Sequence, residues 1–209
     1  ASRMQALARR IQVALLPERL PQIPGYALLG GNVPSRGVSG DLYTVTLREQ
    51  DCVLMVADVS GKGMAASLLG ASLEALSVGP IDVGHDADEI CLRVSRRLFQ
   101  RTPPEKYATA FVAILNPTTS CLRWCNAGHN PALLLHRGGA VEKLAKGGHP
   151  LGLLAQTSYS AQTSQLGPGD LLVIYTDGVT EACAPDDEEF GIERLAEVCR
   201  AFLGADLKE

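Results

Sequence analysis

The sequence has no hydrophobic run close to the roughly 20 residues that a membrane-spanning helix needs, and no signal peptide opens it. We therefore expect no membrane span. The sequence also has no excess of positive charge. Its formal net charge is −4 and its basic residues are scattered, so the footprint of a nucleic-acid-binding surface is missing. Residue 1 is Ala and not Met, and we therefore expect a processed start or an excised fragment.

A phosphate-binding P-loop is missing as well. The glycine-rich stretches at 37–41 (GVSGD) and 61–63 (GKG) do not have the spacing of that motif. Met64 follows the second stretch, where a P-loop carries Ser or Thr.

The cysteines form no CxxC pair of the zinc-binding type. Most of them lie in apolar patterns, where free cysteine behaves as a small hydrophobic residue, and we expect a reducing, cytoplasmic setting. Cys121 and Cys125 would share one face of a predicted strand. Two core thiols are favoured there, and a metal-binding pair is the alternative. The six are Cys52, Cys91, Cys121, Cys125, Cys183 and Cys199.

What the sequence does contain is typical of a globular domain. Its 209 residues fit one domain, and 46% of them are hydrophobic and 20% charged. Short strands joined by short turns predict antiparallel pairing, and helices flank them. We predict an α+β protein with two sheets sandwiched by helices. The predicted helices are 1–16, 64–76, 87–101 and 192–203, and the predicted strands are 26–30, 42–47, 52–58, 107–115, 121–126, 132–136 and 171–176.

Three aspartates stand beside glycines at the ends of predicted strands: Asp58, Asp177 and Asp41. An ionised carboxylate at the edge of an apolar core is costly unless it is hydrogen-bonded, paired or bound to a metal. Asp58 could cap the following helix or bind turn amides. Alternatively, the three carboxylates converge on a hard cation such as Mg²⁺ or Mn²⁺, which prefers oxygen ligands.

Five segments in this order together resemble the metal-dependent PPM (PP2C-like) serine/threonine phosphatases, and in particular their bacterial SpoIIE/RsbU-type branch. The segments are LLPERLP, DVSGKGMAASL, NAGHNPALLL, GDLLVIYTDGVTEA and FGIERL. The resemblance extends from about Ile11 to Leu195. It implies an αββα sandwich whose central strands hold two Mn²⁺ or Mg²⁺ ions, which activate a water for attack on phosphoserine or phosphothreonine.

The same resemblance implies the roles of individual residues. Asp58 would bridge both metals, and the backbone carbonyl of Val59 would bind one of them. Asp177 would be a further ligand, and Asp41 would act directly or through bound water. Metal coordination lowers the pKa of water, so no nucleophilic side chain is required.

The sequence departs from the family pattern at several positions. In the GGDFYD-like segment, Ser39 replaces a Gly and Thr44 replaces a second Asp, which weakens the upstream half of the predicted site. Residues 60–62 stand where eukaryotic relatives carry a histidine after the bridging Asp. His129 is interpreted as a turn-stabilising imidazole. The family's closing strand, with a paired-Asp segment, is not found before Glu209.

Residues 1–16 are expected to form a linker helix continuing from an upstream sensor or receiver domain, with a possible homodimer through this helix, and residues 17–209 the phosphatase domain. The resemblance implies a phosphorylated protein substrate, an anti-sigma-factor antagonist of STAS type in a bacterial partner-switching pathway. One alternative is a metal-defective, phosphatase-like module that sequesters the same partner. Another is a metal-dependent hydrolase of small phosphoesters.

Overall fold

The computed structural model describes residues 7, 9, 10, 12, 14, 16–34 and 38–204. The larger sheet has the strand order β1-β2-β3-β4-β7. Strand β8 also pairs with β4, at residues 121–124. The smaller sheet has the order β6-β5-β9. All strand pairs are antiparallel except β4 with β7. The strands are β1 Leu42–Arg48, β2 Asp51–Val59, β3 Ala108–Asn116, β4 Cys121–Ala127, β5 Ala132–Leu135, β6 Val141–Leu144, β7 Gly147–Gly148, β8 Gln162–Gln165 and β9 Leu171–Val173.

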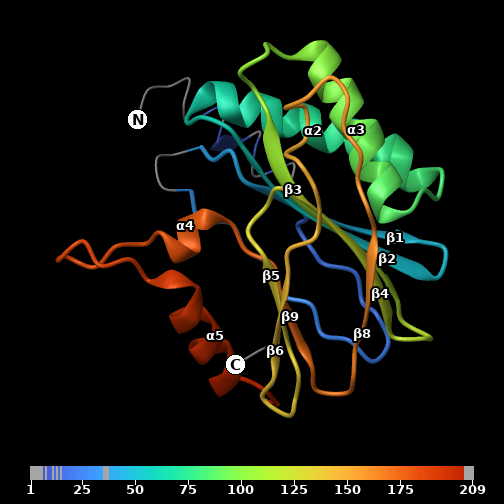
Figure 1. Ribbon diagram of the computed structural model, residues 1–209, viewed down its shortest axis with the longest axis vertical. Coiled ribbons are helices and arrows are strands. Elements are labelled where there is room, and N and C mark those ends of the chain that lie inside the picture. Colours follow the sequence, from blue (N-terminus) through green and yellow to red (C-terminus); the bar gives the residue numbers. More distant parts are fainter. Residues whose placement is uncertain are drawn as a thin grey trace.

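The helices that accompany the sheets are α2 Met64–Asp82, α3 Ala87–Arg101, α4 Asp177–Thr180 and α5 Gly191–Ala201. Helices α2 and α3 cover one side of the larger sheet, and α5 lies on the opposite side of the molecule, against the smaller sheet (Figure 1). The described part of the chain thus has the four layers of an αββα sandwich, as predicted.

Three hydrophobic clusters fill the spaces between these layers. The first lies between α2, α3 and the larger sheet, and includes Met55 and Leu73. The second lies between the two sheets, where Phe111 and Trp124 stack with ring centroids 5.7 Å apart. The third packs α5 against the smaller sheet through Leu195. Successive strand residues point to opposite faces. In β2 this alternation sends Val53, Met55, Ala57 and Val59 to the helices, and Cys52 and Leu54 to the second sheet.

Two predicted elements differ from the structure. Residues 26–30 form no strand, and the only pairing in this part of the described chain is an isolated bridge between Ile23 and Tyr26. Helix α2 does not end at the Gly79-Pro80 pair but continues to Asp82. A proline inside a helix costs about 3 kcal/mol. Here Pro80 lies in the last turn, and continuing the helix buries Ile81, which is 2% exposed, in the core.

By length and mean hydropathy alone, α2 could cross a membrane, contrary to the expectation from the sequence. It is the one such helix among the described residues. In the domain its buried side chains, including Ala66, Leu73 and Ile81, belong to the cluster that joins α2 and α3 to the larger sheet.

Most of the predicted helix 1–16 lies outside the described residues. Those that are described, at 7, 9, 10, 12 and 14, are helical.

Candidate functional site

Asp41 and Asp58 lie at the same edge of the larger sheet. Leu42 of β1 pairs with Ala57 of β2, so the next position along each strand places Asp41 beside Asp58. Their side chains lie close enough for the Asp41 carboxylate to raise the pKa of Asp58. Asp58 is not a helix cap, because Gly63 caps α2 and no side chain hydrogen-bonds to that end of the helix. The structure therefore excludes helix capping by Asp58 and places its carboxylate beside that of Asp41.

Asp177 reaches this edge from the other sheet. It is the first residue of α4, the single helical turn that follows β9. The pKa of Asp58 is raised from 3.8 to about 7, mainly by burial and then by the carboxylates of Asp41 and Asp177, while a hydrogen bond from the Val59 amide acts in the opposite direction. The charge of Asp177 thus acts on Asp58, although the two residues are far apart in sequence.

The backbone at Gly40 approaches these acids closely. A Cβ atom at Gly40 would lie 2.9 Å from the carbonyl oxygen of Val59 and 3.2 Å from Oδ1 of Asp58. Both oxygens therefore lie near the same point beside Gly40, where a larger residue would not fit without a shift. A carbonyl and carboxylates are the donors that Mg²⁺ and Mn²⁺ take from proteins. The residues present thus fit a divalent cation.

Among the described residues, no three His, Cys, Asp or Glu side chains lie close enough together to enclose an ion by themselves. The predicted three-carboxylate cluster is therefore not formed by the described residues, and a cation held at Asp41 and Asp58 would need the Val59 carbonyl and water as further ligands. Mg²⁺ characteristically keeps several of its waters and is seldom held in a cage made only of protein groups.

A chain of hydrogen bonds joins the two sheets around the acids. Thr109 lies opposite Asp58 in the register of β2 and β3, and its hydroxyl oxygen is 2.8 Å from Nδ1 of His129. The Nε2 atom of His129 donates to the carbonyl of Tyr175 at 3.0 Å. The neighbouring Thr176 donates from Oγ1 to Oδ2 of Asp41 at 3.2 Å. This network, from Thr109 through His129 to the segment after β9, fixes how Asp177 and Asp41 approach Asp58.

His129 is a structural imidazole, as its sequence context indicated. It is 6% exposed, and burial lowers its pKa, while the hydrogen bond to Tyr175 and the charges of Asp41 and Asp177 act in the opposite direction. The ring is therefore neutral. Since Nε2 donates to a carbonyl, Nδ1 accepts from the Thr109 hydroxyl. The buried Asn126 holds the turn, because its Oδ1 accepts from the His129 amide at 2.7 Å.

The two replaced residues upstream have different surroundings. Ser39 supports the site, since its Oγ accepts from the Asp41 amide at 3.0 Å. Thr44 lies away from the acids and faces α2, in a groove shared with Glu74 and Ser77, where its buried hydroxyl has no partner. An aspartate missing at position 44 therefore removes no side chain from the group formed by Asp41, Asp58 and Asp177.

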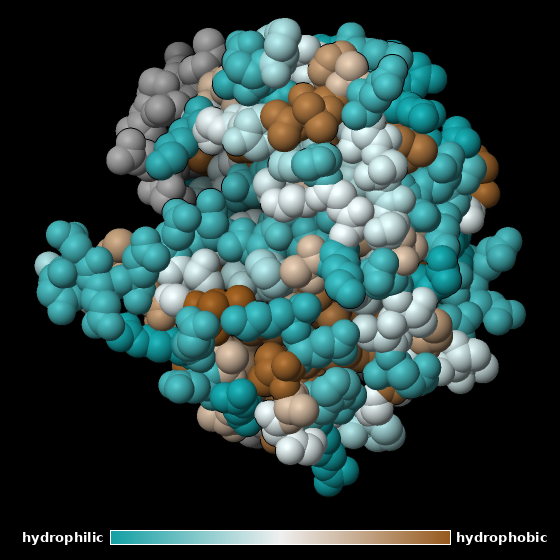
Figure 2. All heavy atoms as spheres, in the orientation of Figure 1, coloured by the Kyte–Doolittle hydropathy of each residue, from teal (hydrophilic) through white to brown (hydrophobic). Residues whose placement is uncertain are grey.

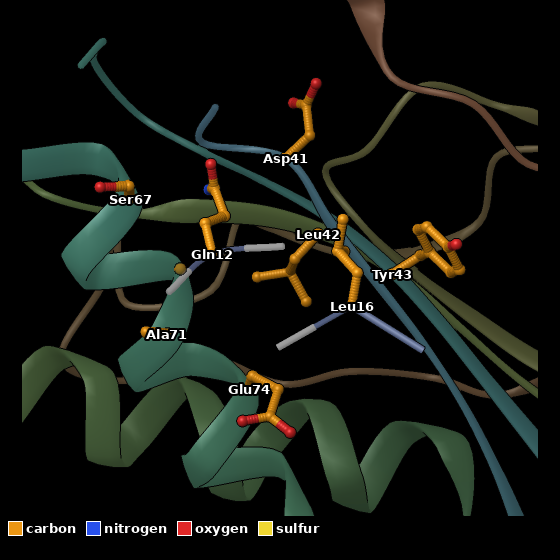
Figure 3. A pocket seen from close by; sticks show the side chains of 9 residues that line it. Gln12, Leu16, Asp41, Leu42, Tyr43, Ser67, Ala71 and Glu74 are labelled. Atoms are coloured by element: carbon orange, nitrogen blue, oxygen red, sulfur yellow. The ribbon is translucent and has the colours of Figure 1, made fainter. Parts of the chain in front are cut away.

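Gln12 connects the N-terminal helical residues to the same loop. Its side chain forms two hydrogen bonds with the backbone of Ser39, one of them from the Ser39 amide to Oε1 at 2.9 Å. Figure 3 shows Gln12 between Ser67 of α2 and Asp41, while the Asp41 carboxylate points away from this pocket. Figure 2 shows the surface hollowed beside α4, with hydrophilic side chains next to the hollow.

Sequence reasoning identified the three acids but not the groups that position them. Gly40, Thr109 and Thr176 carry no signal by themselves, because their roles depend on strands that pair across long sequence separations. The NAGHNP turn was the one visible hint of the network. All six cysteines are free. Cys52, Cys91 and Cys125 are buried, as expected for core thiols, whereas Cys121 and Cys199 are half-buried and Cys183 is exposed.

Comparison with known proteins places this arrangement in a class. The structure matches the SiaA-PP2C domain of Pseudomonas aeruginosa with a TM-score of 0.83 at 20% identity, covering 98% of this chain and 83% of that one. It matches the RsbU and RsbW domains of a Mycobacterium tuberculosis protein with a TM-score of 0.71 at 26% identity, covering 82% of this chain and 48% of that one. The fold is therefore that of PP2C-like phosphatase domains.

Residues 48–209 match the family model described as Stage II sporulation protein E (SpoIIE). The chain belongs to the SpoIIE family. It is 28% identical over 225 residues to Protein IcfG of Synechocystis sp., covering 94% of this chain and 36% of IcfG. It is 26% identical over 176 residues to the phosphoserine phosphatase RsbU of Bacillus subtilis, covering 84% of this chain and 52% of RsbU. The chain thus spans between about a third and a half of these relatives.

Proposed function

We propose that this chain is the catalytic domain of a metal-dependent protein serine/threonine phosphatase. The observation that carries the proposal is the arrangement at Gly40, where oxygens of Asp58 and Val59 lie near one point of the backbone beside Asp41. Family membership supports it, as do the relatives RsbU and RsbP of Bacillus subtilis, both of which are named phosphoserine phosphatases.

The ions we propose are Mn²⁺ or Mg²⁺. Asp58 would bridge two of them, the Val59 carbonyl and Asp177 would each bind one, and Asp41 would contribute directly or through water. When bound, such ions lower the pKa of a water molecule towards neutrality and neutralise charge on the phosphoryl group. A related structure, that of RsbX, was solved in complex with magnesium.

The side chains of this chain would have distinct tasks. Asp41 and Asp58 are already adjacent, so little rearrangement is needed to bind a cation between the β1 and β2 ends. Thr176 orients the Asp41 carboxylate, and the neutral His129 holds the Tyr175 carbonyl so that Asp177 stays at the site. His129 and Thr176 are therefore positioning residues.

The substrate we propose is a phosphorylated regulatory protein, an anti-sigma-factor antagonist of STAS type in a bacterial partner-switching pathway acting in the cytoplasm. Sequence relatives named phosphoserine phosphatases support a phosphoprotein substrate. The sequence resemblance supports the STAS type.

We further propose that residues 1–16 are a linker helix from an upstream regulatory domain and a possible dimer contact. The contact of Gln12 with Ser39, next to Asp41, supports a mechanical link between this segment and the site. Sedimentation of the chain with and without residues 1–16 tests the dimer, and a monomer in both cases would count against it.

Hydrolysis of p-nitrophenyl phosphate and of a phosphorylated STAS-domain protein tests the activity, in Mn²⁺ and in EDTA. The Asp58→Asn variant should be inactive, while Asp82→Asn, an exposed aspartate at the end of α2, should match the wild type. If Asp58→Asn and the wild type are equally inactive but bind the phosphoprotein, the chain is a sequestering module and the phosphatase proposal is wrong.

A further inference from the structure

Lys106 lies against the turn that leaves the carboxylate site. Beyond the β2–β3 register, the Ser60 amide donates to the Tyr107 carbonyl at 2.9 Å, and the Tyr107 amide donates to the Ser60 hydroxyl at 3.0 Å. This pairing places Lys106 beside Gly61. Its Nζ atom lies 3.4 Å from the point that a Cβ of Gly61 would occupy.

The conformation of this turn keeps the ammonium group close to the site. Gly61 has a φ of 101°, a conformation that residues with a side chain rarely adopt. Without a side chain at Gly61, the Lys106 ammonium rests directly on the backbone two residues after Val59. The same turn carries the exposed Lys62.

Neither lysine forms an ion pair with a carboxylate among the described residues. For Lys106 this is notable because the residue is partly buried, and a partly buried charge is costly unless it has a counterion. In the proposed site the aspartates bind divalent cations and not these lysines. A positive group at the rim of a metal site is suited to an anion that also binds the metal.

We infer that Lys106, assisted by Lys62, binds the phosphate group of the substrate and is a specificity-determining residue of the site. This inference rests on the proposed phosphatase function. A lysine ammonium binds phosphate as a compact point charge, with three donors that can follow the group as it moves. Lys106 would hold the phosphoserine or phosphothreonine dianion at the rim, and the exposed Lys62 would add charge attraction as the substrate approaches.

The experiment compares Lys106→Gln, Lys62→Gln and Lys106→Arg with the wild type. Lys143→Gln is the matched control, because Lys143 lies on β6 and pairs with Glu193. KM, kcat and inhibition by inorganic phosphate are measured in saturating Mn²⁺ for p-nitrophenyl phosphate and for a phosphoprotein. The Mn²⁺ dissociation constant and Tm of each variant are measured in parallel.

For Lys106→Gln we expect KM and the inhibition constant of phosphate to rise by about 10-fold or more, which is the scale of one lost charge-assisted hydrogen bond. The Mn²⁺ dissociation constant should stay within about twofold of the wild type, and Lys106→Arg should restore much of the loss. A smaller rise is expected for Lys62→Gln. Wild-type KM and phosphate inhibition in Lys106→Gln would overturn the inference.

A separate readout distinguishes this outcome from a failure of the proposed function. If the wild type hydrolyses neither substrate in Mn²⁺, the phosphatase proposal fails. Inorganic phosphate then remains as a probe, through the rise in Tm that it produces in the Mn²⁺-loaded protein. A rise lost in Lys106→Gln and kept in Lys143→Gln supports the phosphate site, whereas no rise in the wild type, or an equal rise in both variants, overturns it.

Discussion

Replacing Asp58 with Asn should make the metal-free domain more stable, although it removes the residue most central to the site. The pKa of Asp58 is raised from 3.8 to about 7 by burial and by the neighbouring carboxylates. At 1.36 kcal/mol per pKa unit this corresponds to about 4 kcal/mol between the protonated and ionised forms. Because the side chain is only half-buried and solvent screens its charge, we expect about 1–2 kcal/mol of this in the free energy of unfolding.

The pH dependence follows from the sign of this pKa change. The folded protein keeps the Asp58 proton to a higher pH than the unfolded chain does. Stability is therefore lost as the pH rises from about 4 through about 7. Asn does not ionise. The advantage of Asp58→Asn should be absent below about pH 4, grow across this window and stay constant above it.

Thermal unfolding in EDTA at several pH values, and again in Mn²⁺, measures both effects. At pH 8 in EDTA, Asp58→Asn should raise Tm by about 2–8 °C for a domain of this size. Mn²⁺ at 100 times its dissociation constant should stabilise the wild type by about 2.7 kcal/mol and the variant much less, so the order of stability inverts. A variant less stable than the wild type in EDTA at pH 8, or a difference independent of pH, would refute the reasoning. Asp82→Asn is the control.

Three further predictions concern the surroundings of Asp58. Gly40→Ala should abolish Mn²⁺-dependent activity and Mn²⁺ binding by calorimetry, because its Cβ would lie 2.9 Å from the Val59 carbonyl. Gly31→Ala, where a Cβ meets nothing within 4 Å, should leave both unchanged. His129→Ala should lower the free energy of unfolding by about 2–4 kcal/mol in urea denaturation, because it leaves buried partners unpaired. Because burial lowers the pKa of His129, the stability that His129 contributes should be lost as the pH falls below about 6.5. Loss of this stability at high pH would contradict the prediction. Ellman's reagent should label the exposed Cys183 in the folded protein but not Cys52, whose pKa burial raises to about 11; rapid labelling of Cys52 would show that this part of the core opens.

Strongly patterned segments made most of the fold predictable. The run from Cys52 to Asp58 alternates between two faces and ends in an acid, and the structure places it inside the larger sheet, between β1 and β3. Helix α3 was predicted with its observed bounds, because acidic residues open it and arginines close it. Local pattern and tertiary packing agree in both elements.

Other elements could not be predicted because their stability comes from partners. Strand β8 reads QTSQ and has no hydrophobic alternation, yet it pairs with the exposed edge of β4. Strand β7 is two glycines, which fit because a Cβ at Gly147 would lie 2.1 Å from the carbonyl oxygen of Asn126. The apolar run at 26–30 forms no strand because no strand among the described residues pairs with it. Its one backbone pairing there is the Ile23–Tyr26 bridge.

For the candidate site the division is similar. The acids were visible as single charges after apolar strands, since an unpaired carboxylate in that position needs a reason. Asp41 and Asp58 are direct neighbours because of the register between β1 and β2. No local sequence pattern predicts that register. The role of Thr176 in positioning Asp41 depends on a hydrogen bond between side chains that are 135 residues apart in sequence.

The candidate site is shared between the two layers of strands: Asp58 ends a strand of one, and Asp177 follows a strand of the other. A cation bound by both residues would cross-link the two sheets. Loss of the cation would then loosen β5, β6 and β9 before the helical side of the molecule, with faster amide exchange and easier proteolysis there. The supply of metal would in this way set how long the domain survives, as well as how fast it works.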